Sequence, residues 1–402
     1  MPLSKSFQKL WLSSGASNLT DGLLKTAAPL LATTLTKDPF WIATIAALSM
    51  LPWLLFAIPI GGLVDRFNRR NMLAIANSIR FGSLALLTVS IGFEFVSLWL
   101  LLLATFLFGI GEVIYDTTLQ SMLPQVLRKD QLESGNARLT FTSVTLGEFV
   151  GAPLGGLLFA AAIALPFYLG TAGILVAVLL VLSIPKDYSL EALPAPKAEK
   201  TGFWEEIRFG IQYLYQDKTL LKLVLLTSAI GFFFAASSST MVLFFTETLD
   251  TPPALFGVLF ALPAAGALIG SAVARRLSEG FGRTKVMAFV MLVSSVVVLI
   301  QGFSVNYWML AGFLTVGSAL ITIWNVLLMA TYHEIIPTEL FGRIHGTRRT
   351  LVWGLMPIGA LIGGLLAGID LRLPLIVGGI ACSILSLAGY RFITKLGKLL
   401  VS

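Results

Sequence analysis

The amino-acid sequence predicts an all-α membrane protein in which twelve transmembrane helices form two halves of six. Of its 402 residues, 56% are hydrophobic and 12% are charged, which is about half the charged share of an ordinary soluble domain. Apolar runs of about 20 residues, the length that spans a bilayer, recur along the chain. One long hydrophilic stretch, 186–219, leaves six such runs on each side of it. This composition disfavours a soluble enzyme, because one water-facing globule could not hide so much apolar surface.

Each expected span is an apolar run that ends at charged or turn-forming residues, and single polar residues inside a run are usual for helices around an interior. The first half has spans at 8–35, 40–62, 72–92, 97–122, 139–160 and 163–184. The second half has spans at 220–246, 254–277, 286–304, 307–331, 350–369 and 373–394. No small-residue cleavage site follows the first run, so we expect it to remain as a span.

Lys and Arg lie almost entirely in connections on one side of the expected spans. The exceptions are Lys37 and Arg372 on the other side, and Lys25 and Arg80 within spans. By the positive-inside rule both termini are cytoplasmic, and the even number of spans agrees with this. We therefore expect a multi-pass, monomeric protein of the bacterial inner membrane. Its net charge of +7 then reflects membrane orientation and not nucleic-acid binding.

The chain divides into an N-terminal six-helix bundle at 1–185, a cytoplasmic linker at 186–219 and a C-terminal six-helix bundle at 220–402. The linker is rich in Pro and charge, and its segment 203–216 has the spacing of an amphipathic surface helix. The two bundles share the pattern Gly-x-x-x-Gly-Gly-Leu-Leu, which begins at Gly151 and again at Gly359. A parallel duplication of six spans explains this and puts the substrate site near the membrane midplane; chance similarity of apolar helices is the alternative.

Between the second and third spans the chain reads GGLVDRFNRR. This resembles the signature loop of the major facilitator superfamily, G-x-L-A-D-R-x-G-R-R/K, with matches at Gly61, Leu63, Asp65, Arg66, Arg69 and Arg70. The resemblance implies that Asp65 helps to hold the cytoplasmic side shut and that Arg69 anchors the loop. Asn68 replaces the usual Gly, and we expect it to adopt the left-handed backbone that Asn tolerates. Charges that merely end a span would explain the arginines but not Asp65.

The fifth span resembles the antiporter motif of exporters in that superfamily, G-x-x-x-G-P-x-x-G-G. The matching residues are Gly147, Gly151, Gly155 and Gly156, with the proline displaced by one to Pro153. The segment LPQVLRKDQLESGNAR before it is similar to the macrolide-efflux and enterobactin-exporter branch. The other interpretation is that these small residues only let two helices approach closely.

Ionisable residues in mid-membrane cost about 2.5–3.5 kcal/mol each and tend to be functional. Asp21 and Lys25 lie near the middle of the first span, four apart on one helix face. Glu112 and Asp116 have the same spacing near the middle of the fourth span. Resemblance to the superfamily implies that spans 1, 4, 7 and 10 line a central cavity, so these charges would share one chamber. The alternative is structural neutralisation, in which Lys25 or Arg80 pairs with the acids so that the bundle can fold.

The remaining candidates are Glu148, beside the glycine pattern, and Trp324 with Asn325 in the tenth span. Glu148 is either a coupling site or a partner of Arg138. The seventh span adds Phe232–Phe234 and Ser237–Ser239, so the second half offers a neutral aromatic wall that suits an amphiphilic substrate. Lys25 could attract an anionic group of the substrate or neutralise Asp21.

Proton coupling is expected at Glu112 and Asp116. Two carboxylates about 6 Å apart repel by about 2.8 kcal/mol at an effective dielectric of about 20, so one of the pair should retain a proton. Asp21, with Lys25 one turn away, should stay charged and is a poorer carrier.

Together these features predict a secondary active transporter, not an enzyme, that exports a drug- or siderophore-like amphiphile in exchange for protons. No nucleotide motif, metal-ligand set or cofactor is expected, and Cys382 reads as a core residue. The alternatives are a lipid or lysolipid flippase, an importer of an organic anion, and a non-transporting membrane sensor.

Overall fold

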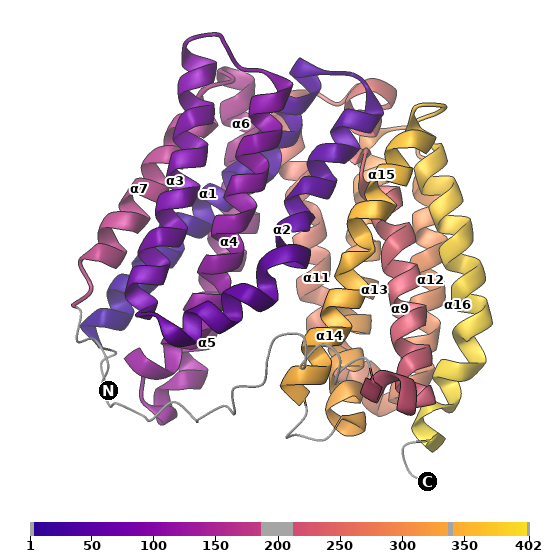
Figure 1. Cartoon of the computed structure of the whole chain (residues 1–402). Coiled ribbons are helices and arrows are strands. Elements are labelled where there is room, and N and C mark those ends of the chain that lie inside the picture. The colour runs from indigo at the N-terminus through magenta and orange to yellow at the C-terminus, as the bar shows by residue number, and fades with distance from the viewer. Residues whose placement is uncertain (1–3, 186–211, 337–340, 400–402) are drawn as a thin grey trace. The chain divides into compact units, whose positions relative to one another are not determined.

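A computed structural model describes residues 4–185, 212–336 and 341–399, and every regular element among them is a helix (Figure 1). The all-α fold class is therefore confirmed. Most of the predicted linker, 186–211, lies outside the described residues, as does most of the predicted amphipathic segment 203–216. Of that segment only 212–216 is described, and it is helical.

The chain forms two compact units, which are described separately below. Unit 1 comprises Met1–Thr36, Leu48–Thr201 and Pro252–Phe260, and unit 2 comprises Lys37–Ala47, Gly202–Thr251 and Ala261–Ser402. The start of the second helix thus belongs to unit 2, and the start of the eighth predicted span belongs to unit 1. An ion pair of 2.5 Å between Lys37 and Glu247 ties the first of these segments into unit 2.

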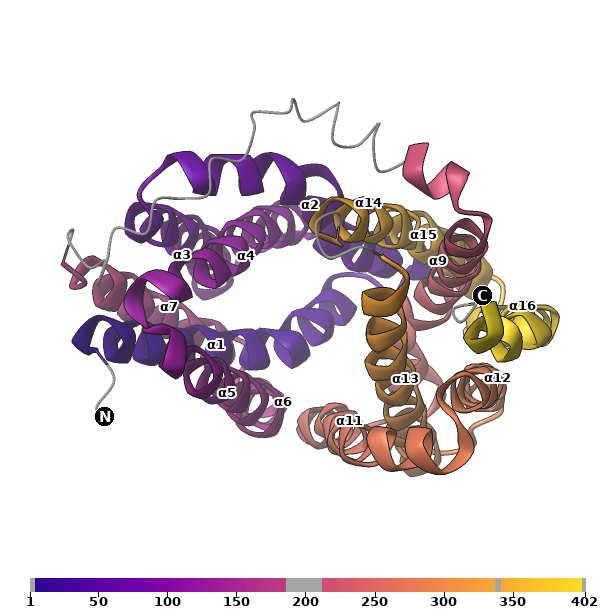
Figure 2. The ribbon, with the colours of Figure 1, turned by 90° about the horizontal axis from the view of Figure 1, so that it is seen from below.

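Unit 1 is built from long helices separated by short turns, and side-chain oxygens cap several of them. Ser97 accepts a hydrogen bond from the backbone N–H of Leu100 and begins the fourth helix, as short polar residues do at helix starts. In Figure 2 the third helix lies between the fourth and seventh. The elements are α1 (Lys5–Leu35), α2 (Pro39–Arg66), α3 (Arg69–Gly92), α4 (Leu98–Val126), η1 (Lys129–Gln131), α5 (Leu132–Thr142), η2 (Ser143–Gly151), α6 (Ala152–Ala161) and α7 (Leu165–Leu182).

Unit 2 has the same construction, with Asp217 and Asn306 capping its helices. Its core joins Leu223, Met287, Leu327 and Ile393, all of them nearly inaccessible. The elements are α9 (Lys218–Ser238), α10 (Met241–Leu243), η3 (Phe244–Thr248), α11 (Pro253–Phe281), α12 (Arg283–Gln301), α13 (Tyr307–Ile335), α14 (Phe341–Gly354), α15 (Met356–Ala367) and α16 (Leu373–Leu399).

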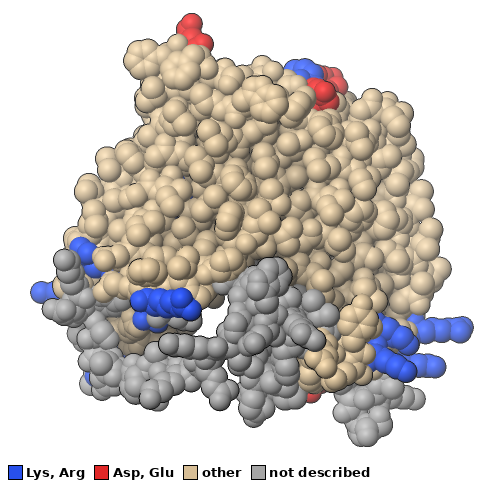
Figure 3. Space-filling view, viewed as in Figure 1, with Lys and Arg blue, Asp and Glu red and all other residues tan. Residues whose placement is uncertain are grey.

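Eleven helical segments among the described residues are long and apolar enough to cross a membrane. The long helix α1 is not one of them, because Ser, Thr, Asn, Asp21 and Lys25 interrupt its apolar character. Large apolar side chains such as Leu179 and Leu387 are exposed on the outside of the helices. On the face shown in Figure 3, Lys and Arg gather at the lower ends of the helices and a broad band above them carries no charged side chain. This is the surface expected of a bilayer-spanning chain.

The glycine pattern shared by the halves makes the same contacts in each unit. At each of its two adjacent glycines an added Cβ would run into another helix. The groups met are the backbone of Leu23 at Gly155, of Gly257 at Gly156 and of Ala236 at Gly363, and the side chain of Ala43 at Gly364. Small residues at these places therefore do allow close helix packing, and the repeated arrangement is what an internal duplication would produce.

We expect Gly151→Ala to destabilise the protein by about 1–3 kcal/mol, the usual cost of overpacking. A Cβ there would lie 2.8 Å from the Cα of Gly22 and 2.7 Å from the carbonyl oxygen of Leu146. Gly82→Ala on α3 is the matched control, because nothing lies within 4 Å of its added Cβ. Thermal unfolding of the purified variants measures the difference, and equal midpoints would contradict the packing role.

The GGLVDRFNRR segment forms the turn from α2 to α3, and the expected left-handed Asn68 is wrong. Asn68 has φ −63° and ψ 120°, and its side-chain oxygen accepts from the N–H groups of Arg70 and Asn71. It is the N-cap of α3, a role that Asn fills well in extended backbone. Gly61 and Gly62 approach no other group closely, so packing does not explain them.

Arg70 fixes this turn to the end of α7. Its Nε donates to the carbonyl oxygen of Ile184 at 2.6 Å, and its Nη2 donates to that of Leu182 at 2.5 Å. These carbonyls close the C-terminal end of a helix, where a cation is favoured. Arg66 is exposed and Arg69 half-buried, while the side chain of Asp65 lies outside the described residues.

Candidate functional site

A polar cavity of about 440 Å³ lies inside unit 1. It brings together five charged residues singled out in the sequence, from α1, α4 and η2. Those residues are Asp21, Lys25, Glu112, Asp116 and Glu148. Gly147, the first glycine of the antiporter-like pattern, also lines it, so the pattern and Glu148 meet at the same cavity.

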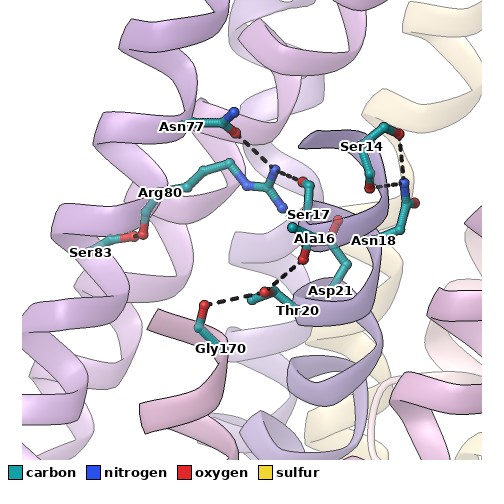
Figure 4. Close-up of polar contacts among 10 residues, drawn as sticks. All are labelled: Ser14, Ala16, Ser17, Asn18, Thr20, Asp21, Asn77, Arg80, Ser83 and Gly170. Atoms are coloured by element: carbon teal, nitrogen blue, oxygen red, sulfur yellow. Dashed lines mark hydrogen bonds and ion pairs between the residues drawn. The ribbon is translucent and has the colours of Figure 1, made fainter. Parts of the chain in front are cut away.

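Asp21 is held by Arg80 of α3, a residue that the sequence suggested only as a structural counter-ion (Figure 4). The Arg80 guanidinium is fully buried, pairs with the Asp21 carboxylate and donates to Ser17 Oγ at 2.5 Å. Its carbon lies 4.6 Å from the ring centroid of Phe108 and 5.3 Å from that of Tyr115. Both distances fall within the range of cation–π attraction. Of the two cations that the sequence offered for pairing with the acids, it is therefore Arg80 and not Lys25 that pairs with Asp21.

The fold also explains how α3 can bring so large a side chain up to α4. At Gly111 an added Cβ would collide with the Arg80 side chain and the carbonyl oxygen of Ala76. A glycine at this position of α4 leaves the room that the arginine fills. The neighbouring Thr20 hydroxyl bonds to the carbonyl oxygens of Ala16 and Gly170, which fixes the same face of α1 against α7 (Figure 4).

Lys25 pairs with Glu148. Its Nζ lies 2.7 Å and 2.5 Å from the two carboxylate oxygens, and both side chains are partly exposed to the cavity. Arg138, the other candidate partner of Glu148, instead lies over the ring of Trp11 at 5.8 Å. Glu148 sits in η2, a π-helical stretch in which the N–H of Ala152 bonds to the carbonyl of Gly147, five residues back. π-Helical turns are rare and are often found at functional sites.

We expect Lys25→Ala and Glu148→Gln to be coupled by about 1 kcal/mol in a double-mutant cycle of thermal unfolding. Removing Lys25 leaves the Glu148 charge without its nearest cation, and removing both restores the balance. The matched cycle of Lys25→Ala with Asp21→Asn should show almost no coupling, because Asp21 pairs with Arg80 instead. The reverse order of the two couplings would contradict the observed pairing.

Glu112 differs from Asp21 and Glu148 in its surroundings. In the part of the chain that the structure describes, no Lys or Arg nitrogen lies within ion-pair distance of Glu112. Glu112 lines the polar cavity together with Asp116 and also lines an adjoining apolar cavity of about 110 Å³ with Leu24, Phe108 and Ser83. This acid therefore lies where the two environments meet.

Unit 2 contains a cavity of its own, of about 530 Å³. Trp324, Asn325 and Phe234 line it, as the sequence suggested for the second half, but it is not neutral, because Arg348 lines it too. Phe232 and Phe233 are not among its lining residues and pack edge to face with each other. Ser237 is buried and donates to the carbonyl oxygens of Phe233 and Pro374, so it joins α9 to α16. The sequence did not single out Arg348, because it is one of several basic residues just before the eleventh predicted span.

Residues 1–398 match a protein family described as transmembrane secretion effector. The chain is 21% identical over 370 residues to macrolide efflux protein A of Streptococcus pyogenes, covering 90% of this chain and 89% of that protein. It is 30% identical over 149 residues to the class H tetracycline resistance protein of Pasteurella multocida, covering 36% of each. The predicted resemblance to macrolide-efflux proteins is thus confirmed.

Solved structures confirm the fold. The nucleoside transporter NupG superposes with a TM-score of 0.77 at 11% identity, covering 96% of this chain and 100% of that one. A bacterial homologue of the iron transporter ferroportin, in an inward-facing state, gives 0.79 at 13% identity, covering 98% and 100%. At these identities the likeness shows the architecture alone.

Proposed function

We propose that this chain, which belongs to the transmembrane secretion effector family of the major facilitator superfamily, exports a drug- or siderophore-like small molecule. The family is one of transporters and not of enzymes. Distant relatives are a macrolide efflux protein and a tetracycline resistance protein. We infer that this chain moves an amphiphilic small molecule out of the cytoplasm in exchange for protons.

Proton exchange is supported by a difference among the acids of the polar cavity, some of which have an ion-pair partner among the described residues while Glu112 does not. Asp21 has Arg80 and Glu148 has Lys25 as ion-pair partners, so each of these two carboxylates has a cation beside it. Glu112 lies beside Asp116 without such a cation and borders an apolar cavity. Like charges close together favour uptake of one proton, and an apolar border acts in the same direction. The pair titrates jointly, so the proton belongs to both residues.

We place both termini and the α2–α3 turn on the cytoplasmic side, on the basis of the Lys and Arg distribution. Asp65 would then act in closing that side, as its motif implies. No nucleotide, metal or other cofactor is needed for an exchange of this kind.

We expect Asp65→Asn to remain inserted and to lose most of its turnover, while single cysteines placed at cytoplasmic helix ends become more reactive. The reason is that the neutral side chain no longer holds the closed form. Asn68→Ser, which keeps the N-cap oxygen, is the matched control and should transport normally. Alkylation rates in a background that lacks Cys382 give the measurement, and unchanged rates with normal transport would remove Asp65 from the mechanism.

The function itself is tested in everted membrane vesicles with an imposed pH gradient. Uptake of a labelled macrolide or tetracycline into everted vesicles, with alkalinisation of the lumen, is the expected result. Movement in the opposite direction would indicate an importer, and gradient-independent movement of fluorescent lysolipid would indicate a flippase. Absence of flux for every compound would contradict a transport function.

A further inference from the structure

The cavity of unit 2 combines an aromatic lining with a single charged side chain. Of the described residues that line it, Arg348 alone carries a formal charge, and no acid is among them. This is the reverse of the cavity in unit 1, where acids predominate. At about 530 Å³ the cavity falls within the size range of small-molecule sites, which are mostly apolar with a few placed polar groups.

Arg348 is presented by α14 against α13. The guanidinium carbon lies 4.2 Å from the ring centroid of Tyr332, a residue that is itself fully buried. Stacking on an aromatic face fixes the plane of a guanidinium while its five N–H donors stay directed along that plane. A planar fork held in this way matches a carboxylate, which it can bind through two parallel hydrogen bonds.

The rest of the lining suits an aromatic body. Trp324 and Trp353 line the cavity, and Met291, Met329 and Met356 line it as well. Methionine is flexible and polarisable, so it adapts to ligands of different outline and makes favourable contacts with rings. Asn325 lines the same cavity and makes no side-chain hydrogen bond within the described residues, so its amide is available to a ligand.

We propose that this cavity binds amphiphilic organic acids, with the aromatic body among the tryptophans and methionines and the carboxylate on Arg348. The proposal rests on the proposed export function, because it takes the bound organic acid to be the class of molecule that is exported. The two are separable, because binding to unit 2 requires neither a pH gradient nor the acids of unit 1.

The test is calorimetric titration of the full chain in lipid nanodiscs, with empty nanodiscs subtracted, using probes of one shape and different charge. The probes are 1-naphthylacetate, 2-(1-naphthyl)ethanol, 1-(1-naphthyl)ethylamine and octanoate. Naphthylacetate should bind about tenfold more tightly than the alcohol, as expected of one charge-assisted hydrogen-bonded contact. The amine should bind more weakly than the alcohol, and octanoate more weakly than naphthylacetate.

Arg348→Gln should bring the acid and the alcohol to equal affinity without changing the affinity of the alcohol. Arg348→Lys, which keeps a charge but not the fork, should keep part of the preference and serves if the first variant does not fold. Arg275→Gln is the control, because that exposed arginine of unit 2 pairs with Glu279 on the surface.

Equal affinities of the wild-type protein for acid and alcohol would overturn the proposal, as would no binding by any probe or an unchanged preference in both Arg348 variants. Octanoate binding as tightly as naphthylacetate would overturn the aromatic part. Normal acid binding without gradient-driven flux would leave this site in place and contradict the export function instead.

Discussion

Gradient-driven export should disappear in both Glu112→Gln and Asp116→Asn, while substrate binding survives in at least one of them. Either change removes one of the two neighbouring acids, so their mutual repulsion, which favours a proton bound between them, is lost. The amides keep the shape of the side chains, which preserves the cavity. Flux in proteoliposomes at several imposed pH gradients, with binding followed separately, gives the measurement.

Glu279→Gln is the matched control for these variants. Glu279 is an exposed acid of α11 that pairs with Arg275 one turn away, and its loss should leave transport unchanged. Full gradient-dependent transport in the Glu112→Gln, Asp116→Asn double variant would show that the two acids are structural. In that event Glu148 would be the next acid to examine, because it lines the same cavity and pairs there with Lys25.

Arg80→Met should cause the largest loss of stability of any single substitution in unit 1, about 3 kcal/mol or more. It leaves the Asp21 carboxylate without its cation and removes contacts to Ser17, Phe108 and Tyr115. Breaking an ion pair whose cation is fully buried usually costs more than replacing both partners by apolar residues. The heat resistance of the folded monomer on size-exclusion chromatography measures the effect.

The double variant Arg80→Met, Asp21→Leu should recover much of that loss, since no charge is then left behind. Arg80→Lys should recover little, because an ammonium cannot keep both the fork to Asp21 and the stacking on two rings. A double variant no more stable than Arg80→Met would mean that Arg80 acts through packing alone. Restored stability without restored transport would assign the pair a further role in positioning the cavity.

The fold class could be predicted from local patterns in the sequence, and the family resemblance added that the charges of the first and fourth spans share a chamber. Apolar runs of membrane length set the helices, and charges four residues apart on a helix must share a face. The pairing of those charges could not be predicted in the same way. Lys25 is one turn from Asp21, yet it reaches Glu148 on another helix, and Asp21 is neutralised by Arg80 from a third.

Two other differences have local causes that the sequence did not display. Asn68 was expected in a left-handed turn because the family has Gly there, but α3 starts at Arg69, directly after it, which makes Asn68 a cap instead. Arg348 looked like one more basic residue of a cytoplasmic connection. Only the packing of α14 on Tyr332 shows that its guanidinium belongs to a cavity lining.

The π-helical stretch η2 gives the fifth predicted span an adjustable register. Each of its turns holds one residue more than an α-turn, so the stretch contains extra chain length without a break in the backbone hydrogen bonds. Returning it to α-helical spacing would carry Glu148 around the helix axis by about 100° and away from Lys25, while α6 and its glycines stayed packed on α1. A change of pitch over nine residues would thus redistribute charge in the polar cavity.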